Sequence, residues 1–191
     1  YKLTLLKEYS DDVRRTYRVD MTGFGGEPTC GILVEPVAEG CYETVINYMG
    51  YGAEIWYPNP SDAPERVQFI LCNRNQSLNR KPDEDNLWCT RGLESKDTYY
   101  YRGVFADAVR AIDFVCSRPK VDQDRLYAEG GSQGGAITLV AASLDDRLDA
   151  MPQCRHGLFF QTTDGQNASA QSDFTCHCHI TAYRNSRQRR D

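Results

Sequence analysis

Residues 125–135, RLYAEGGSQGG, decide the fold. A short apolar run at 126–128 leads into Gly-x-Ser-x-Gly, and an apolar, alanine-rich segment at 136–144 follows with the character of a helix. Strand, glycine-flanked serine and helix form the layout of a nucleophile elbow, in which the glycines let strand and helix pass close together. This turn would hold the Ser132 hydroxyl outward and place the backbone N–H of Gln133 at the positive end of the helix, where an oxyanion is stabilised. The alternative is a glycine-rich turn without chemistry, as in any α/β protein.

Length, composition and charge bound the class of protein. A chain of 191 residues suits one domain with a sizeable core, and 26% charged residues is ordinary for a soluble protein. The net charge of -5 argues against a nucleic-acid binder, and the arginine-rich segment at 184–190 is expected to be a solvated end. No apolar stretch is long enough to span a membrane. The first residues do not resemble a signal peptide, which favours the cytoplasm over secretion.

The eight cysteines are scattered along the chain. Four of them lie within or beside apolar runs, where a free cysteine behaves as a small buried hydrophobe: Cys30, Cys41, Cys72 and Cys116. A disulfide framework is typical of short secreted chains with little core. We therefore expect reduced structural thiols.

The rest of the chain predicts an antiparallel start followed by strand–helix alternation. Strands are expected at residues 2–8, 13–20, 30–35, 42–49 and 66–72, and a helix at 103–117. A turn at 10–12 joins the first two strands as a hairpin, and the polar stretch 73–98 is too long for an ordinary connection, which indicates a functional loop or excursion. After the elbow helix, 158–162 is the one segment with any strand character. This order predicts a largely parallel sheet with helices packed on it.

Several motifs stand around the elbow in a specific order. They are GYG at 50–52, YYYRG at 99–103, DAVRAIDF at 107–114, RPKVD at 118–122 and GGSQGG at 130–135. Together they resemble the acetyl xylan esterase / cephalosporin-C deacetylase family of α/β-hydrolases, over about residues 30–148.

The resemblance implies a fold, a site and an activity. The fold would be an α/β-hydrolase-like three-layer sandwich with a mostly parallel sheet. Ser132 would be the nucleophile, and the backbone N–H groups of Tyr51 and Gln133 would hold the oxyanion. Such enzymes remove acetyl groups from acetylated saccharides and related small esters without a metal or other cofactor, and they are often homo-oligomers.

Two features depart from the family pattern. Its Arg-Gly-Gln after the fifth strand reads Arg74-Asn75-Gln76 here, which would strain the turn if that position needs a positive φ, although Asn tolerates this better than most residues. After residue 149 the family's continuation is not recognisable. Residues 1–149 are therefore interpreted as the N-terminal and central part of the domain, and residues 150–191 as a divergent or disordered tail. An incomplete sheet would leave an edge exposed, so we expect a poorly stable or aggregation-prone chain.

A catalytic triad needs a base for Ser132 and an acid that orients the base. In hydrolase chain order the candidates are Asp164 or Asp173, followed by His177 or His179. The fold normally places further strands between the elbow and the acid, and the tail offers none. The triad Asp and His are thus not assignable, and turnover by this chain is expected to be very low.

Two other classes of function stay open. A metal-binding module would use zinc-type ligands in the tail, namely Cys154, His156, Cys176, His177, Cys178 and His179, although their spacing lacks the gaps of ordinary zinc sites. A non-catalytic carbohydrate-binding relative would use an aromatic platform of Trp56, Tyr57, Trp88 and residues 99–101. A serine-directed probe, a chelator and retention on xylan distinguish the three classes.

Overall fold

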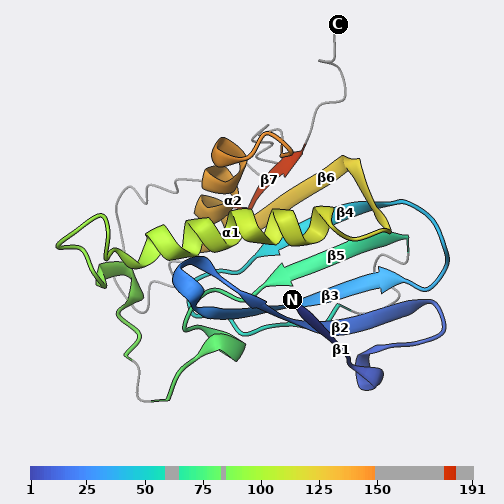
Figure 1. Cartoon of the computed structure of the whole chain (residues 1–191), viewed down its shortest axis with the longest axis horizontal. Helices are drawn as coiled ribbons and strands as arrows, with labels where there is room; N and C mark the ends of the chain where they lie inside the picture. The colour runs from blue at the N-terminus through green and yellow to red at the C-terminus, as the bar shows by residue number, and fades with distance from the viewer. Residues whose placement is uncertain (59–64, 83–84, 149–178, 184–191) are drawn as a thin grey trace, which may run out of the picture.

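The computed structural model describes residues 1–58, 65–82, 85–148 and 179–183, which form a mixed sheet covered by two helices (Figure 1). The strands are β1 (Lys2–Leu5), β2 (Arg14–Thr22), β3 (Pro28–Pro36), β4 (Tyr42–Tyr48), β5 (Arg66–Leu71), β6 (Val121–Gly131) and β7 (His179–Tyr183). The helices are α1 (Tyr100–Cys116) and α2 (Gln133–Leu144). The strands lie in the order β1-β2-β3-β5-β4-β6-β7.

The predicted hairpin at the start of the chain is confirmed. The Asp11 carboxylate accepts hydrogen bonds from the backbone N–H groups of Val13 and Arg14, at 2.8 and 2.7 Å, and this turn sets the antiparallel pairing of β1 with β2. The first strand is shorter than predicted, because the chain leaves the sheet at Leu5 and Lys7–Tyr9 forms a 3₁₀ turn.

The parallel part of the sheet is smaller than predicted. In the described sheet β4 pairs in parallel with β5 and with β6, whereas the other pairings are antiparallel. A helical crossover contributes to the parallel centre, because α1 carries the chain from β5 back to the start of β6, which then runs parallel to β4. The antiparallel strands β1, β2 and β3 extend one side of that centre, as predicted for the start of the chain.

A strand in the tail, β7, was not predicted. It pairs antiparallel with residues 127–131 of β6, whose backbone groups would otherwise lack partners on that side. Local periodicity carries no sign of such a long-range pairing, which explains the miss. The weaker expectation of a strand at 158–162 falls outside the described residues, and the boundary at residue 149 stays a prediction.

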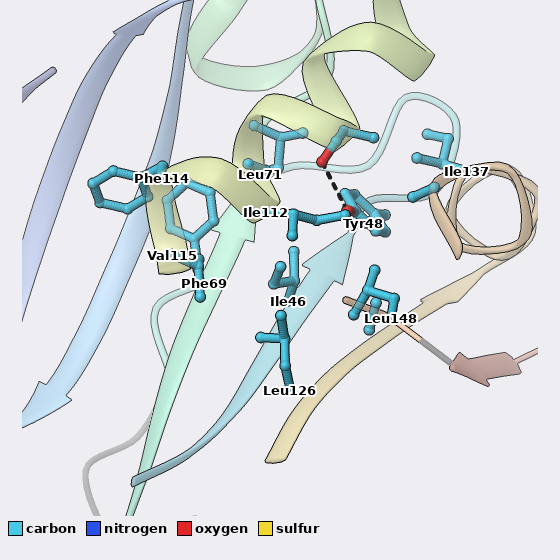
Figure 2. Packing of buried hydrophobic residues seen from close by; sticks show 14 of the residues in the cluster. Ile46, Tyr48, Phe69, Leu71, Ile112, Phe114, Val115, Leu126, Ile137 and Leu148 are labelled. Atoms are coloured by element: carbon cyan, nitrogen blue, oxygen red, sulfur yellow. Dashed lines mark hydrogen bonds between the residues drawn. The ribbon is translucent and has the colours of Figure 1, made fainter. Parts of the chain in front are cut away.

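Both helices pack on the same face of the sheet and enclose the larger core (Figures 1 and 2). Ile46, Phe69 and Leu126 of the sheet meet Ile112 of α1 and Ile137 of α2 there, and all five side chains are fully buried. Burial of this apolar surface is the main stabilising contribution to the fold.

The opposite face carries a second, smaller apolar cluster. Ile32, Val34 and Ile70 form its centre, and Ile55 and Tyr57 of the segment after β4 cover it. Within the described part of the chain no helix lies on this face, so the second helical layer of the expected three-layer sandwich is not among these residues.

The cysteines of the described part are free thiols. Cys30 and Cys72 are buried, as predicted, and Cys41 is exposed, contrary to prediction, because it follows the turn at Gly40 before β4 begins. Among the helices that the structure describes, none combines the length and apolarity needed to cross a bilayer.

Candidate active site

The predicted elbow is present where β6 ends and α2 begins. Ser132 lies between Gly131 of the strand and Gln133 of the helix, with φ of 53° and ψ of −120°. A positive φ is costly for any residue other than glycine, and such strained conformations are typical of a nucleophile elbow. Its carbonyl oxygen already accepts a hydrogen bond from the N–H of Ala136, at 3.3 Å, and the residue is exposed.

The glycines around Ser132 are required by close backbone contacts. A Cβ at Gly130 would lie 2.4 Å from the carbonyl carbon of Gly134, and a Cβ at Gly134 would lie 2.0 Å from the carbonyl oxygen of Tyr48. Both distances are far below van der Waals contact with backbone that cannot move aside. Glycine at these two positions therefore lets α2 start directly above the ends of β4 and β6.

The start of α2 presents its positive end at Ser132. Gln133 is the first helical residue, so its N–H has no acceptor within the helix. No acidic side chain lies in the first turn, where it would compete with a bound anion for the free N–H groups. Gln133 is 8% exposed, and neither polar atom of its side-chain amide has a hydrogen-bond partner among the residues that the structure describes.

The loop after β4 lies beside the elbow. Because β4 and β6 are parallel neighbours with Tyr48 opposite Gly130, both strands end at the same edge of the sheet. The Cβ position of Gly50 is 3.6 Å from the carbonyl oxygen of Gly131, so the peptide that leads into Tyr51 is next to the peptide that leads into the serine. This is the neighbourhood that the sequence predicts for Tyr51 and Ser132.

The Tyr51 side chain points away from that peptide into the segment 85–98. Its hydroxyl donates a hydrogen bond to the carbonyl oxygen of Asn86, and its ring packs at 5.2 Å from the ring of Trp88. Partial burial raises the pKa of the Tyr51 hydroxyl, and the contact with the Cys89 thiol raises it further. The hydroxyl therefore anchors the loop to this segment.

Asn75 confirms the strain expected at the family's glycine position. Its φ is 57°, in the left-handed region, and Ser77 in the same turn has a φ of 48°. This segment also contains two residues that sequence reasoning missed as contributors to the site, Asn73 and Gln76, whose amides bind the loop carrying Tyr51. The available signal was a dense polar run directly after an apolar strand.

The tail contributes backbone near the serine. In the register of β6 with β7, His179 is opposite Gly131, the residue before Ser132. The other candidate triad and metal-binding residues lie outside the described residues, namely Cys154, His156, Asp164, Asp173, Cys176, His177 and Cys178. In the part of the chain that the structure describes, no three His, Cys, Asp or Glu side chains come together as a metal site.

The proposed aromatic sugar platform does not form as one surface. Trp88 and Tyr100 belong to the core, with 2% and 7% exposure, and Tyr57 stacks on Tyr9 at 3.8 Å between ring centroids. Trp56 alone of the two tryptophans is well exposed. Buried and exposed aromatic residues could not be distinguished from the sequence, because both kinds occur in apolar runs.

The comparisons with known proteins agree with this geometry. The family model for acetyl xylan esterase matches residues 3–155. The chain belongs to the acetyl xylan esterase family. An acetyl esterase of Xylanibacter ruminicola is 46% identical over 68 residues, which is 36% of this chain and 16% of that protein.

Two solved structures show the same fold. The acetyl xylan esterase of Paenibacillus sp. R4 is 31% identical, with a TM-score of 0.67 over 76% of this chain and 50% of that chain. Acetyl xylan esterase 1 of Thermoanaerobacterium sp. JW/SL YS485 is 24% identical, with a TM-score of 0.68 over 78% of this chain and 50% of that chain. The chain thus has the α/β-hydrolase fold of this family and spans about half the length of the solved relatives it matches.

Proposed function

We propose that this chain carries the nucleophile and oxyanion parts of a serine carboxylesterase that removes acetyl groups from acetylated carbohydrates. The Ser132 hydroxyl attacks the acetyl carbonyl, and the N–H groups of Tyr51 and Gln133 stabilise the oxyanion. The alcohol leaves with a proton, and water then attacks the acyl-enzyme and frees the serine and acetate.

One observation carries the proposal. Ser132 sits at a positive φ on the turn between β6 and α2, with the first N–H of the helix and the loop of Tyr51 beside it. A serine in an ordinary turn would have neither the strain nor two backbone donors at the same sheet edge. The names of the relatives, acetyl esterase and acetyl xylan esterase, support acetylated saccharides as the substrate class.

The base and its orienting acid are proposed from the register of β7 and from chain order. His179 is the first candidate, because its backbone is opposite Gly131. His177, Asp164 and Asp173 follow from chain order alone. Self-association as a homo-oligomer is likewise proposed from the family.

The test is hydrolysis of p-nitrophenyl acetate by this chain beside its Ser132→Ala variant. A rate that disappears in the variant supports the serine esterase, and His179→Ala and His177→Ala then identify the base. Equal rates near the uncatalysed background would mean that this chain does not turn over esters. Labelling by a fluorophosphonate probe, lost in Ser132→Ala, checks the nucleophile independently.

A further inference from the structure

Two buried amides that follow β5 hold the loop that follows β4. The Asn73 side-chain NH₂ donates to the carbonyl oxygen of Met49, at 3.0 Å, and the Gln76 side-chain oxygen accepts from the N–H of Gly52, at 2.8 Å. Asn73 and Gln76 are 2% and 1% exposed, so the bond to Met49 is buried and the bond to Gly52 is partly buried. A third bond, from the N–H of Ile55 to the Ser77 hydroxyl at 2.8 Å, extends the contact along the loop.

These bonds fix the peptide groups on both sides of one particular peptide. Peptide groups are planar, so holding the carbonyl of Met49 fixes the plane between Met49 and Gly50, and holding the N–H of Gly52 fixes the plane between Tyr51 and Gly52. The peptide between them carries the N–H of Tyr51. With both neighbours held, the direction of that N–H is restricted.

We propose that Asn73 and Gln76 are positioning residues for the oxyanion hole, which together hold the Tyr51 N–H toward Ser132. The inference rests on the proposed function for its catalytic meaning, because the N–H matters only if an oxyanion forms beside the serine. The two residues act through the backbone of the loop and do not touch the reacting atoms.

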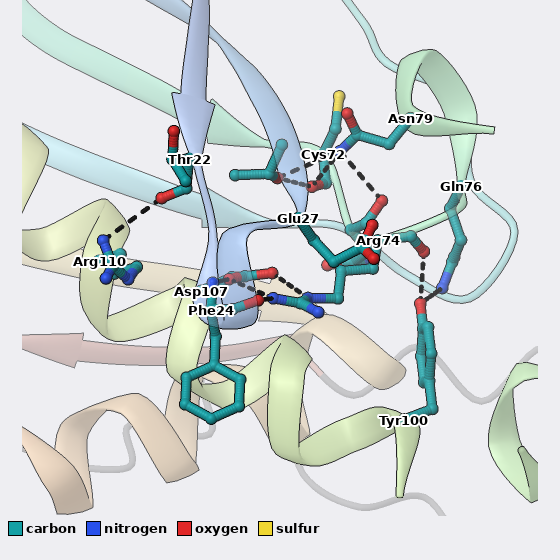
Figure 3. Close-up of polar contacts among 12 residues, drawn as sticks. Thr22, Phe24, Glu27, Cys72, Arg74, Gln76, Asn79, Tyr100, Asp107 and Arg110 are labelled. Carbon is teal, nitrogen blue, oxygen red and sulfur yellow. Dashed lines mark hydrogen bonds and ion pairs between the residues drawn. The ribbon is translucent and has the colours of Figure 1, made fainter. Parts of the chain in front are cut away.

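Contacts behind Gln76 fix the orientation of its amide (Figure 3). Its NH₂ donates to the Tyr100 hydroxyl, at 3.0 Å, and that hydroxyl donates to the carbonyl oxygen of Arg74. Because the hydroxyl proton is committed to Arg74, the hydroxyl oxygen needs a donor, and the amide oxygen is left for Gly52. Burial raises the pKa of Tyr100, so this hydroxyl keeps its proton at all working pH values.

The same segment is tied to α1 by an ion pair. The Arg74 guanidinium binds both carboxylate oxygens of Asp107 and also the carbonyl oxygen of Phe24 (Figure 3). Arg74 is 14% exposed and Asp107 3% exposed at the side chain, so the pair is a fixed, geometrically demanding contact. The segment that carries Asn73 and Gln76 is therefore fixed to α1 through Arg74.

The experiment compares the same isosteric change at two amides. Gln76→Met removes the bond to Gly52, and Gln68→Met removes a bond of β5 to Asn47, 2.7 Å long, which does not involve the loop. Amide hydrogen exchange of residues 46–53 and 126–131 is measured in the whole chain. We expect exchange at Gly52 to rise about tenfold or more in Gln76→Met while β6 stays protected, and to stay unchanged in Gln68→Met.

Kinetics supply the second readout. Displacement of an oxyanion donor lowers kcat about tenfold to a hundredfold, and KM should change less than about twofold, because the ground-state ester does not depend on this N–H. Asn73→Leu should behave like Gln76→Met. Gln76→Glu keeps an acceptor for Gly52 and should retain wild-type exchange there, which gives a folded test if Gln76→Met fails to fold.

The outcomes separate the two proposals. Unchanged exchange at Gly52 in Gln76→Met, or an equal rise in Gln68→Met, would overturn the positioning role. So would raised exchange at Gly52 with an unaltered kcat. If the wild-type chain shows no Ser132-dependent hydrolysis, the proposed function fails for this chain, and the exchange data still decide whether the amides hold the loop.

Discussion

At the scale of single residues, the site depends on backbone conformations that few residues can adopt. Ser132 has a positive φ, which costs about 1–3 kcal/mol in a residue other than glycine. The strain persists because β6 on one side and α2 on the other are both anchored in the core, through Ala128 and Ile137. Glycines at 130 and 134 allow those anchors to be so close.

Gly134→Ala should destabilise the protein, and Gly50→Ala should not. A Cβ at Gly134 would overlap the Tyr48 carbonyl, whereas a Cβ at Gly50 would meet the Gly131 carbonyl at 3.6 Å, an ordinary contact. We expect a loss of about 2–3 kcal/mol in the free energy of unfolding for Gly134→Ala and less than about 1 kcal/mol for Gly50→Ala. Urea denaturation measures both, and equal losses would contradict this account of the elbow.

The residue types predicted the elbow turn at Ser132 but not the hydrogen bonds that hold the neighbouring loop. The glycines at 130, 131 and 134 predict the elbow, because close backbone approach needs glycine whatever the rest of the fold does. Asn75 stands where the family has a glycine, which indicated a positive φ at this position, and its φ is 57°. The bonds of Asn73 and Gln76 could not be predicted, because an amide fits any partner and the sequence does not say which backbone groups come near.

At the scale of elements, α1 holds the segment after β5 that binds the Tyr51 loop. Its apolar side packs on the sheet, and its first half binds Arg74 through Asp107. The Asp107 carboxylate also accepts from the N–H of Phe24, at 2.6 Å, and so joins the turn after β2 to the segment after β5. One carboxylate on a helix thereby holds two connections that are distant in sequence.

Asp107→Asn should cost about 3 kcal/mol of stability, because it removes the carboxylate that pairs directly with the largely buried Arg74 guanidinium. Asp20→Asn is the matched control. Its pair with Arg18 is exposed, with 39% and 43% of the two side chains accessible, and its loss should cost less than about 1 kcal/mol. Denaturation curves of the two variants give the comparison. A cost for Asp107→Asn no larger than that for Asp20→Asn would show that the pair does not support α1.

The end of α2 predicts a dependence of stability on pH. Hydrogen bonds from the Arg147 guanidinium lower the pKa of Asp145 below its ordinary value of 3.8, and the same arginine reaches Asp113 of α1 at 2.5 Å. A lowered carboxyl pKa in the folded state contributes stability that is present above the unfolded pKa and is lost as the pH falls through the folded pKa.

Asp145→Asn should therefore reduce the free energy of unfolding by about 1–2 kcal/mol at pH 7. The difference from the wild type should shrink as the pH falls below the ordinary carboxyl pKa of 3.8, at which the unfolded chain takes up its proton, toward the lower pKa of the folded state. Urea denaturation at pH 7, 4 and 3 measures it. A difference that stays constant over this range would contradict the role of the ion pair.

Element types were more predictable than their pairings. The apolar run at Phe69, Ile70 and Leu71 predicts a strand covered on both faces, and both faces of β5 are buried. The register of β7 against β6 could not be predicted, because it depends on contacts between residues some fifty positions apart, such as Tyr127 with Tyr183. The antiparallel start of the sheet was predicted, whereas the antiparallel pairing of β7 with β6 was missed for the same reason.

At the scale of the whole molecule, α2 carries apolar side chains that are exposed among the described residues. The helix is apolar on all sides, a pattern typical of helices surrounded by protein. One side packs on the sheet through Ile137 and Ala141, whereas Leu139 on the opposite side is 41% exposed and Leu144, the last residue of the helix, is 60% exposed. The homo-oligomer proposed above is one way in which such a surface would be covered.

We expect this surface to drive self-association of the chain, because removing the exposed leucines from water is favourable in proportion to the apolar area buried. The double variant Leu139→Gln, Leu144→Lys should raise the monomer fraction in light scattering at micromolar concentration without lowering the denaturation midpoint, since neither side chain is in the core. The control is Leu87→Gln, Leu93→Gln, which removes two leucines that are at least as exposed, 64% and 60% accessible, and that lie outside α2. If both double variants raise the monomer fraction equally, association follows general surface hydrophobicity, and α2 has no special part in it. A wild-type chain that is monomeric throughout would show that the exposed side of α2 needs no cover at all.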